Sequence, residues 1–232
     1  MKRLELTVVS GPTRTPLQFN VKRMVNAGYV GRDTKAVKAH IEELAREGVP
    51  APLSVPMIFP VLSHNITAED RIEVIGNKTS GEAEFVLLLD GKEVLVGVGS
   101  DHTDRDVERE SIVMSKQVCQ NVLSPEVWRY ADAEQSWDDL IIQSWVKPAE
   151  TGDWLLYQKA PLRTIISARD LISLVKPAIK DGQSDELVIF SGTVPILTRE
   201  MIFGSAFRAE LIDEKAGRSL RCEYQVVILD YL

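Results

Sequence analysis

Short apolar or alternating segments, bounded by turn residues, recur along most of the chain and have the length of β-strands. Seven of them are predicted as strands: residues 4–9, 71–75, 85–89, 93–98, 187–191, 207–212 and 219–229. Between the third and the fourth lies Asp90-Gly91, a dipeptide that tolerates positive φ and favours a tight turn. The pattern therefore predicts an antiparallel hairpin within a strand-rich fold.

Two segments have helical periodicity instead. In residues 34–47 an apolar stripe recurs at i, i+4 and i+7, and Asp33 is placed to cap the first turn. Residues 167–175 carry a second apolar face and end before Pro177. Four prolines lie between residues 50 and 60, which predicts an extended connector and not an element of its own.

Composition and charge narrow the class of protein. The 232 residues include 44% hydrophobic side chains, which can form a substantial core. The 27 basic and 34 acidic side chains give a net charge of −7 without long runs, so no nucleic acid or anionic membrane is expected as a partner. Cys119 and Cys222 are too few for a disulfide framework and lack the spacing of a zinc site.

No apolar run approaches the ~20 residues of a membrane span, and the first residues lack the apolar core of a signal peptide. We therefore expect a soluble cytoplasmic protein. Because strands outnumber helices, we expect an α+β, strand-rich fold. Residues 1–60 would form an N-terminal layer or small subdomain, and residues 61–232 the main β-rich domain of one structural unit.

Acidic side chains gather at one end of the predicted hairpin. Glu82 and Glu84 point to the same face of a strand because side chains alternate, and the returning strand brings Asp101 to the same end. Carboxylates this close repel one another unless they are protonated, separated by water or bridged by a cation. A bridging cation would be a hard ion such as Mg²⁺, Mn²⁺ or Ca²⁺, which suits their oxygens. The alternatives are a solvent-exposed strand end for the glutamates and an ordinary polar turn around Asp101.

Four short motifs follow one another along the chain in an order typical of one family. These are Glu82-Ala83-Glu84, the Ser-Asp-His-Thr-Asp-Arg-Asp segment of residues 100–106, Lys116, and Gly192-Thr193-Val194-Pro195 after a predicted strand. They resemble the Glu-x-Glu, Asn-Asp-x-Ser-x-Arg-Asp, lysine and Gly-Thr-Pro motifs of the fumarylacetoacetate hydrolase family. The resemblance covers roughly residues 70–230, the catalytic domain of that family.

The resemblance implies a ligand set and a substrate site. Glu82, Glu84 and Asp101 would bind a divalent ion, usually Mg²⁺, with Mn²⁺ or Ca²⁺ as substitutes. Lys116 would hold or polarise the oxygens of a substrate, and Thr193 would contact a substrate carboxylate. The implied fold is a mixed β-sandwich roll, usually a homodimer.

The chain also departs from the family pattern. Typical members have a helix between the Glu-x-Glu and the aspartate motif, whereas Asp90-Gly91 predicts a hairpin here. His102 replaces a small residue and is expected either in the substrate pocket or behind the metal ligands. Arg105 is expected to orient an acid or to bind an anionic substrate bidentately. A pocket altered in this way predicts a different substrate.

The family includes carbon–carbon hydrolases of acylpyruvates, decarboxylases and sugar-acid dehydratases. We predict a metal-dependent hydrolase that cleaves a carbon–carbon bond of a small 2-oxo acid; the alternatives are a lyase of the same family and a non-catalytic binding module. Hydrolysis requires a base, and His40 and Glu43 lie one turn apart on the predicted helix, as in a dyad that some members carry on a lid helix. The alternative is a solvated surface pair.

Overall fold

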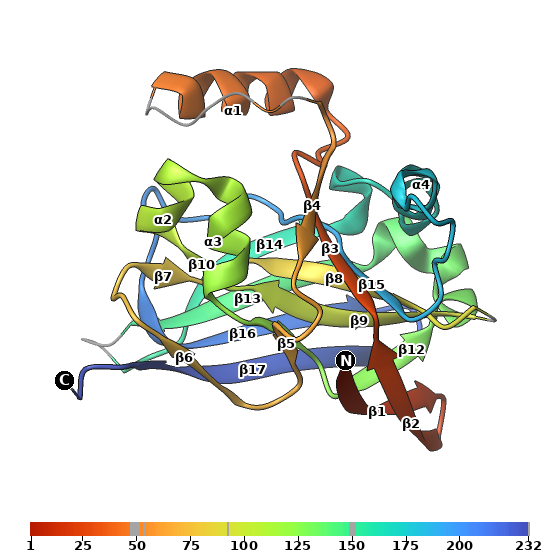
Figure 1. The fold of residues 1–232 in the computed structure, drawn as a ribbon. Helices are drawn as coiled ribbons and strands as arrows, with labels where there is room; N and C mark the ends of the chain where they lie inside the picture. The colour runs from red at the N-terminus through yellow and green to blue at the C-terminus, as the bar shows by residue number, and fades with distance from the viewer. Residues whose placement is uncertain (47–51, 53, 92, 149–151, 232) are drawn as a thin grey trace.

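Two large β-sheets dominate the computed structural model, which describes residues 1–46, 52, 54–91, 93–148 and 152–231 (Figure 1). The larger sheet has ten strands: β1 (Lys2–Ser10), β2 (Thr13–Val21), β3 (Arg23–Gly28), β4 (Met57–Val61), β5 (Ile66–Thr67), β8 (Ala83–Leu89), β9 (Val94–Asp101), β11 (Asn121–Leu123), β12 (Glu126–Arg129) and β15 (Leu187–Phe190). The second sheet has five: β6 (Arg71–Val74), β13 (Ile141–Pro148), β14 (Leu155–Pro161), β16 (Gly204–Asp213) and β17 (Arg218–Ile228). Strands β7 (Thr79–Ser80) and β10 (Thr103–Asp104) form a separate pair.

Helices are few and short. The α-helices are α1 (Thr34–Arg46), α2 (Arg105–Glu110), α3 (Ile112–Val118) and α4 (Ala168–Val175), and the 3₁₀ turns are Tyr130–Asp132, Glu134–Asp139, Leu162–Thr164 and Lys176–Ala178. Both sheets are mixed, since β1–β12 and β3–β15 are parallel in one sheet and β6–β17 in the other, among antiparallel neighbours. The predicted strand-rich fold with few helices is confirmed.

The strands β8 and β9 are buried on both faces. Phe85 and Val96 face the five-stranded sheet and pack in one core with Phe207 and Leu220. Val86 and Leu95 point the other way into a second core, to which all ten strands of the larger sheet contribute. That second core joins strands as far apart in the sheet as β3 and β11, through Met24 and Leu123.

The predicted hairpin is confirmed. Strands β8 and β9 are antiparallel, with Ala83 opposite Ser100 and Leu89 opposite Val94, and Gly91 has a φ of +89° at the turn. All seven predicted segments form strands. Several strands that the pattern did not reveal pair with them, among them β2, β3, β13 and β14.

Both predicted helices form. The side chain of Asp33 accepts hydrogen bonds from the backbone N–H groups of Lys35 and Ala36 at the start of α1, and Ser167 caps α4. Residues 50–60 were predicted to be an extended connector without an element of its own. This prediction is wrong for the last residues of the segment, because β4 forms there and pairs with β3. Residues 47–51 and 53 lie outside the described residues. Pro60 is tolerated because β4 is at the edge of the sheet.

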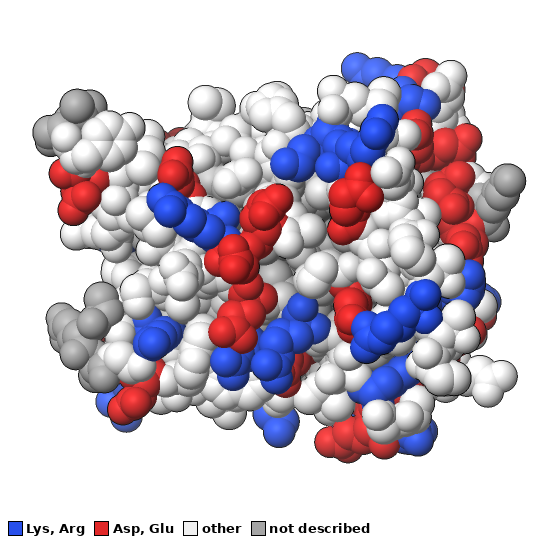
Figure 2. Space-filling model, turned by 90° about the horizontal axis from the view of Figure 1, so that it is seen from below, with Lys and Arg blue, Asp and Glu red and all other residues white. Residues whose placement is uncertain are grey.

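Strands from both sides of residue 60 share the ten-stranded sheet, and the proposed division at that point stays a prediction. Figure 2 shows basic and acidic side chains intermingled on the face seen from below. Pairs such as Arg208–Glu223 and Arg221–Glu210 bring opposite charges together across β16 and β17. None of the helices in the described ranges has the length and apolarity of a membrane span.

Candidate metal centre

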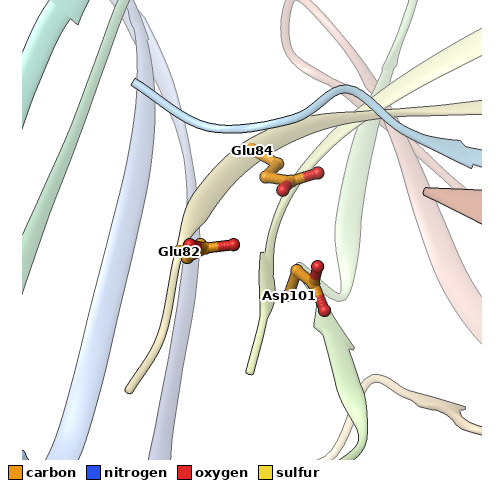
Figure 3. Close-up of side chains that lie close together, drawn as sticks. All are labelled: Glu82, Glu84 and Asp101. Atoms are coloured by element: carbon orange, nitrogen blue, oxygen red, sulfur yellow. The ribbon is translucent and has the colours of Figure 1, made fainter. Parts of the chain in front are cut away.

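Glu82, Glu84 and Asp101 lie together, with one carboxylate oxygen of each within 4.8 Å of the others. Figure 3 shows Glu82 just before the first residue of β8, Glu84 within the start of β8, and Asp101 at the end of the neighbouring strand β9. The backbone N–H of Asp101 donates to the carbonyl of Glu82 at 3.1 Å, so the two residues stand opposite each other. The sequence order of the hairpin is therefore enough to bring the three acids together.

The acids are not at a solvent-exposed strand end. Glu84 and Asp101 are 1% and 0% exposed, whereas the side chain of Glu82 keeps 20% of its surface. Burial, followed by the nearby Asp101 charge, raises the pKa of Glu84 well above its ordinary value. Burial also raises the pKa of Asp101, against the opposing effect of Lys116. The cluster opens to solvent on the Glu82 side.

Two buried cationic side chains hold these acids. The Lys116 ammonium contacts Asp101 directly and lies 3.7 Å from Glu82. Arg105 donates to Glu82 at 3.0 Å and to Glu108 at 2.7 Å. Burial alone would lower the pKa of Arg105 and of Lys116, but the neighbouring carboxylates raise both. Burial alone would raise the pKa of Glu82, but the two cations lower it. Lys116 therefore carries its full charge at neutral pH.

The residues present fit a hard divalent cation. This connected network holds four carboxylates, those of the three acids and Glu108, against the charges of Arg105 and Lys116. With all four ionised, two negative charges are in excess, which one divalent ion would neutralise. Oδ1 of Asp101 is buried and has no hydrogen-bond partner among the described residues. An oxygen donor set with an unused buried lone pair suits Mg²⁺, Mn²⁺ or Ca²⁺ better than zinc.

His102 lies in a different network. Its Nδ1 is 2.9 Å from the hydroxyl of Tyr224 and its Nε2 is 2.9 Å from the hydroxyl of Thr79. Tyr224 in turn donates to Ser100 at 2.8 Å, so His102 donates through Nδ1 and accepts through Nε2. Burial, with the nearby Arg105 charge, lowers the pKa of His102 to about 3 and keeps the ring neutral. We call Thr79, Ser100, His102 and Tyr224 the inter-sheet network; it leaves no ring nitrogen for a substrate.

Thr193 lies beside the cluster, at the turn after β15. Its hydroxyl donates to the carbonyl of Ala83 at 2.9 Å and accepts from Gln158 at 2.7 Å. The neighbouring Gly192 donates its backbone N–H to Glu84 at 2.8 Å. Gly192 has a φ of +81°, and a Cβ there would meet Val30 at 2.7 Å, so the turn depends on glycine.

Gln158 was not found from the sequence. This side chain is 1% exposed and makes four hydrogen bonds, with Ala83, Ser144, Thr193 and Val194. It therefore ties the start of β8 to the Thr193 turn. A lone glutamine in a strand gives no signal in the sequence, because only the fold brings its four partners together.

Tyr29 was also missed. It has a φ of 57°, which is rare for a residue with a side chain and occurs mostly where the surroundings enforce it. Its pKa is raised, first by burial and then by Glu108, and Lys116 opposes this effect. The phenol therefore lies within electrostatic reach of the cationic and acidic groups of the centre.

The structure brings together Glu82, Glu84, Asp101, Arg105 and Lys116. His40 and Glu43 belong to α1, but their side chains lie outside the described residues. Figure 1 places α1 above α2 and α3, the helices that carry Arg105 and Lys116. The predicted base pair stays a prediction.

Solved structures with the same fold cover nearly the whole chain. Cg1458 matches with a TM-score of 0.65 at 13% identity, over 97% of this chain and 88% of its own. A 5-carboxymethyl-2-hydroxymuconate delta-isomerase from Mycobacterium smegmatis matches with 0.63 at 15%, over 94% and 87%. A 2-keto-3-deoxy-D-arabinonate dehydratase complexed with magnesium and 2,5-dioxopentanoate matches with 0.62 at 16%, over 90% and 74%.

These matches confirm the resemblance to the fumarylacetoacetate hydrolase family at the level of the fold. At such low identity they establish the fold alone. No curated protein matches the chain. A family model described as a protein of unknown function, DUF2848, matches residues 27–224, and the chain belongs to that family.

Proposed function

We propose that this protein is a divalent-cation-dependent enzyme acting on a small 2-oxo acid, with Glu82, Glu84 and Asp101 as the protein ligands of the cation. The observation that supports it is the buried carboxylate triad, closed within 4.8 Å beside the ammonium of Lys116. Such a cation, when bound, supplies Lewis-acid stabilisation of the negative charge that develops on a 2-oxo acid as an adjacent bond breaks. We propose Mg²⁺ as the ion, with Mn²⁺ or Ca²⁺ as substitutes.

The protein's own residues have separate roles in this proposal. Lys116 stays protonated and places a fixed positive charge next to the substrate oxygens. Arg105 holds Glu82 in one orientation, because its two terminal nitrogens bind Glu82 and Glu108. Arg105 can still donate its remaining N–H groups to an anionic substrate. Thr193 is proposed to contact the substrate carboxylate, and His102 to support the site from behind through the inter-sheet network.

Within this class we propose hydrolysis of a carbon–carbon bond in an acylpyruvate-like acid, with His40 and Glu43 activating water. A lyase is the second candidate, because one solved structure of the same fold is a 2-keto-3-deoxy-D-arabinonate dehydratase with bound magnesium. A decarboxylase needs no activated water, whereas a dehydratase still needs a base to remove a proton from its substrate. The hydrolase and a decarboxylase therefore differ in their dependence on the α1 base.

The test is turnover of acylpyruvates, oxaloacetate and a 2-keto-3-deoxy sugar acid, with Mg²⁺ and after treatment with EDTA. We expect turnover with Mg²⁺ and none after EDTA has removed the cation. Glu43→Gln is compared with Glu42→Gln on the same helix. A hydrolase loses roughly 10²–10⁴-fold in rate in the first variant only, whereas a decarboxylase retains its rate in both. Cation binding without turnover of any oxo acid would instead indicate a binding module. We also propose that the protein is a homodimer. Light scattering on the same preparations measures its molar mass.

A further inference from the structure

A ring of buried polar side chains closes one end of the second core. Along β8 and β9 the inward positions are apolar at Val86 and Leu95 and become acidic at Glu84 and Asp101. Asn121 of β11 stands directly opposite Asp101, so its side chain lies on the same face. Asn26 of β3 pairs with inward-facing Phe190 of β15, and its side chain lies close enough to Asp101 to lower the pKa of that carboxyl, against the larger effect of burial. We call Glu84, Asp101, Asn26 and Asn121 the polar ring.

The polar ring contains most of the unpaired buried side-chain atoms found in the described part of the chain. Among the described residues, six buried side-chain nitrogen and oxygen atoms have no hydrogen-bond partner. Five of these belong to the ring: both polar atoms of Asn26, both of Asn121, and Oδ1 of Asp101. A buried amide without a partner costs stability, so five such atoms together point to a small polar molecule that binds between them.

Burial limits what that molecule can be. Asn26, Asn121 and Asp101 are each 0% exposed, while the centre opens on the side of Glu82. A substrate that enters beside Glu82 therefore meets the cation and Lys116, and the carboxamides lie behind them. A buried water typically makes two to four hydrogen bonds, and amide and carboxylate atoms supply both donors and acceptors for it.

We propose that Asn26 and Asn121 enclose an ordered water against Oδ1 of Asp101, and that this water fixes the carboxylate in the orientation that binds the cation. The inference rests on the proposed function, because it assigns these amides to the same centre. Asn26 and Asn121 are positioning residues: they act on the cation through Asp101. Neither was predicted from the sequence, since an isolated asparagine in an apolar strand has no characteristic spacing.

The test is the affinity for Mn²⁺, measured by calorimetry on Asn121→Leu and Asn26→Leu. Leucine has nearly the shape of asparagine but can bond neither the water nor Asp101. We expect the Kd for Mn²⁺ to rise about 10–100-fold, as for other residues that orient a metal ligand. We expect no loss in the melting temperature of the cation-free protein. Asn20→Leu is the matched control, because Asn20 lies on β2, bonds Glu186 and is not part of the polar ring. The Kd of this variant for Mn²⁺ should equal that of the wild type.

Wild-type binding with an unchanged Kd in both leucine variants would overturn the inference and leave the proposed function intact. A wild-type protein that binds no Mn²⁺ would overturn both. A crystal structure of the wild type with Mn²⁺ does not depend on how the variants fold. It should show a water within about 3.2 Å of Oδ1 of Asp101 and of at least one of the two carboxamides. Amides that bond only to each other, or directly to Asp101 with no water between them, would contradict the proposal.

Discussion

The two faces of the β8–β9 hairpin both carry buried polar side chains, yet they differ in how completely these are paired. On the face toward the five-stranded sheet, the ring nitrogens of His102 and the hydroxyl of Tyr224 all have partners in the inter-sheet network. On the opposite face, five atoms of the polar ring have none. Strand alternation alone separates them, since Ser100 and Asp101 are neighbours in the chain.

This difference indicates what each face is for. A fully paired buried network is part of the scaffold, because each group offsets the desolvation of its partner. An acidic cluster with unused oxygens and surplus negative charge is stable only if it binds a cation or keeps a proton. Burial, the largest cause, raises the pKa of Glu84, so in the absence of a cation this carboxyl can keep its proton. The comparison predicts that substitutions on the paired face change stability and that substitutions on the acidic face change cation binding.

The largest expected effect is on the side of the paired face, at Gln158 of β14, whose side chain accepts from the backbone N–H of Ala83. Gln158→Leu would leave the backbone N–H of Ala83 and the hydroxyls of Ser144 and Thr193 without that partner. Several buried groups lose their bonds at once, so the free energy of unfolding should fall by roughly 3–5 kcal/mol. Urea denaturation followed by tryptophan fluorescence measures it.

The matched control for Gln158 is Gln143→Leu, on the neighbouring strand β13. Gln143 is only half-buried and bonds Glu210 at 3.2 Å, so its loss should cost under about 1 kcal/mol. Equal losses in the two variants would show that Gln158, with its four hydrogen bonds, contributes no more to stability than the half-buried Gln143.

The next effect is on the acidic face, at Glu84. Glu84→Gln keeps the shape of the side chain and removes one of the three ligand charges, so the affinity for Mg²⁺ should fall roughly 100-fold, or about 2–3 kcal/mol. The unfolding free energy of the cation-free protein should change by less than about 1 kcal/mol, because glutamine resembles the protonated carboxyl. Thermal unfolding with and without Mg²⁺ measures both quantities.

The control for Glu84 is Glu93→Gln, which removes a partly exposed partner of Arg129. Wild type and this control should gain about 2.7 kcal/mol at a Mg²⁺ concentration of 100 times Kd. If Glu84→Gln gains as much at the same concentration, Glu84 is not a ligand and the acidic face has no special role.

The sequence predicted what depends on short-range order. Strand periodicity and the Asp90-Gly91 turn are local, and together they bring Glu82 and Glu84 to Asp101 without knowledge of the remaining fold. Helices α2 and α3 were missed because each is under eight residues, too short for a periodic stripe. Their place after the aspartate motif nevertheless brings Lys116 to the cluster.

The partners of the predicted residues could not be found in this way. His102 was considered for the substrate pocket because it follows Asp101, but the alternation that turns Asp101 inward turns His102 toward Tyr224, 122 residues away. Gln158, Asn26 and Asn121 are likewise defined by distant contacts. Local sequence patterns thus predict which residues meet along one hairpin. Residues contributed by strands that are distant in the sequence can be identified only from the folded structure.

The smallest expected effect tests the paired face at a single atom. Tyr224→Phe removes the hydroxyl that joins His102 to Ser100 and leaves the ring in place against Phe207. His102 is buried and then loses the acceptor for Nδ1–H, which should lower the unfolding free energy by about 1–2 kcal/mol. With ~2–4 °C per kcal/mol for a chain of this size, the melting temperature should fall by roughly 2–8 °C.

The gain in stability on adding Mg²⁺ should equal that of the wild type, because the hydroxyl lies on the other face of β9 from Asp101. A Tyr224→Phe protein that keeps its stability but loses the Mg²⁺ effect would show that the two faces act as one site, and the distinction between scaffold and ligand site would then fail.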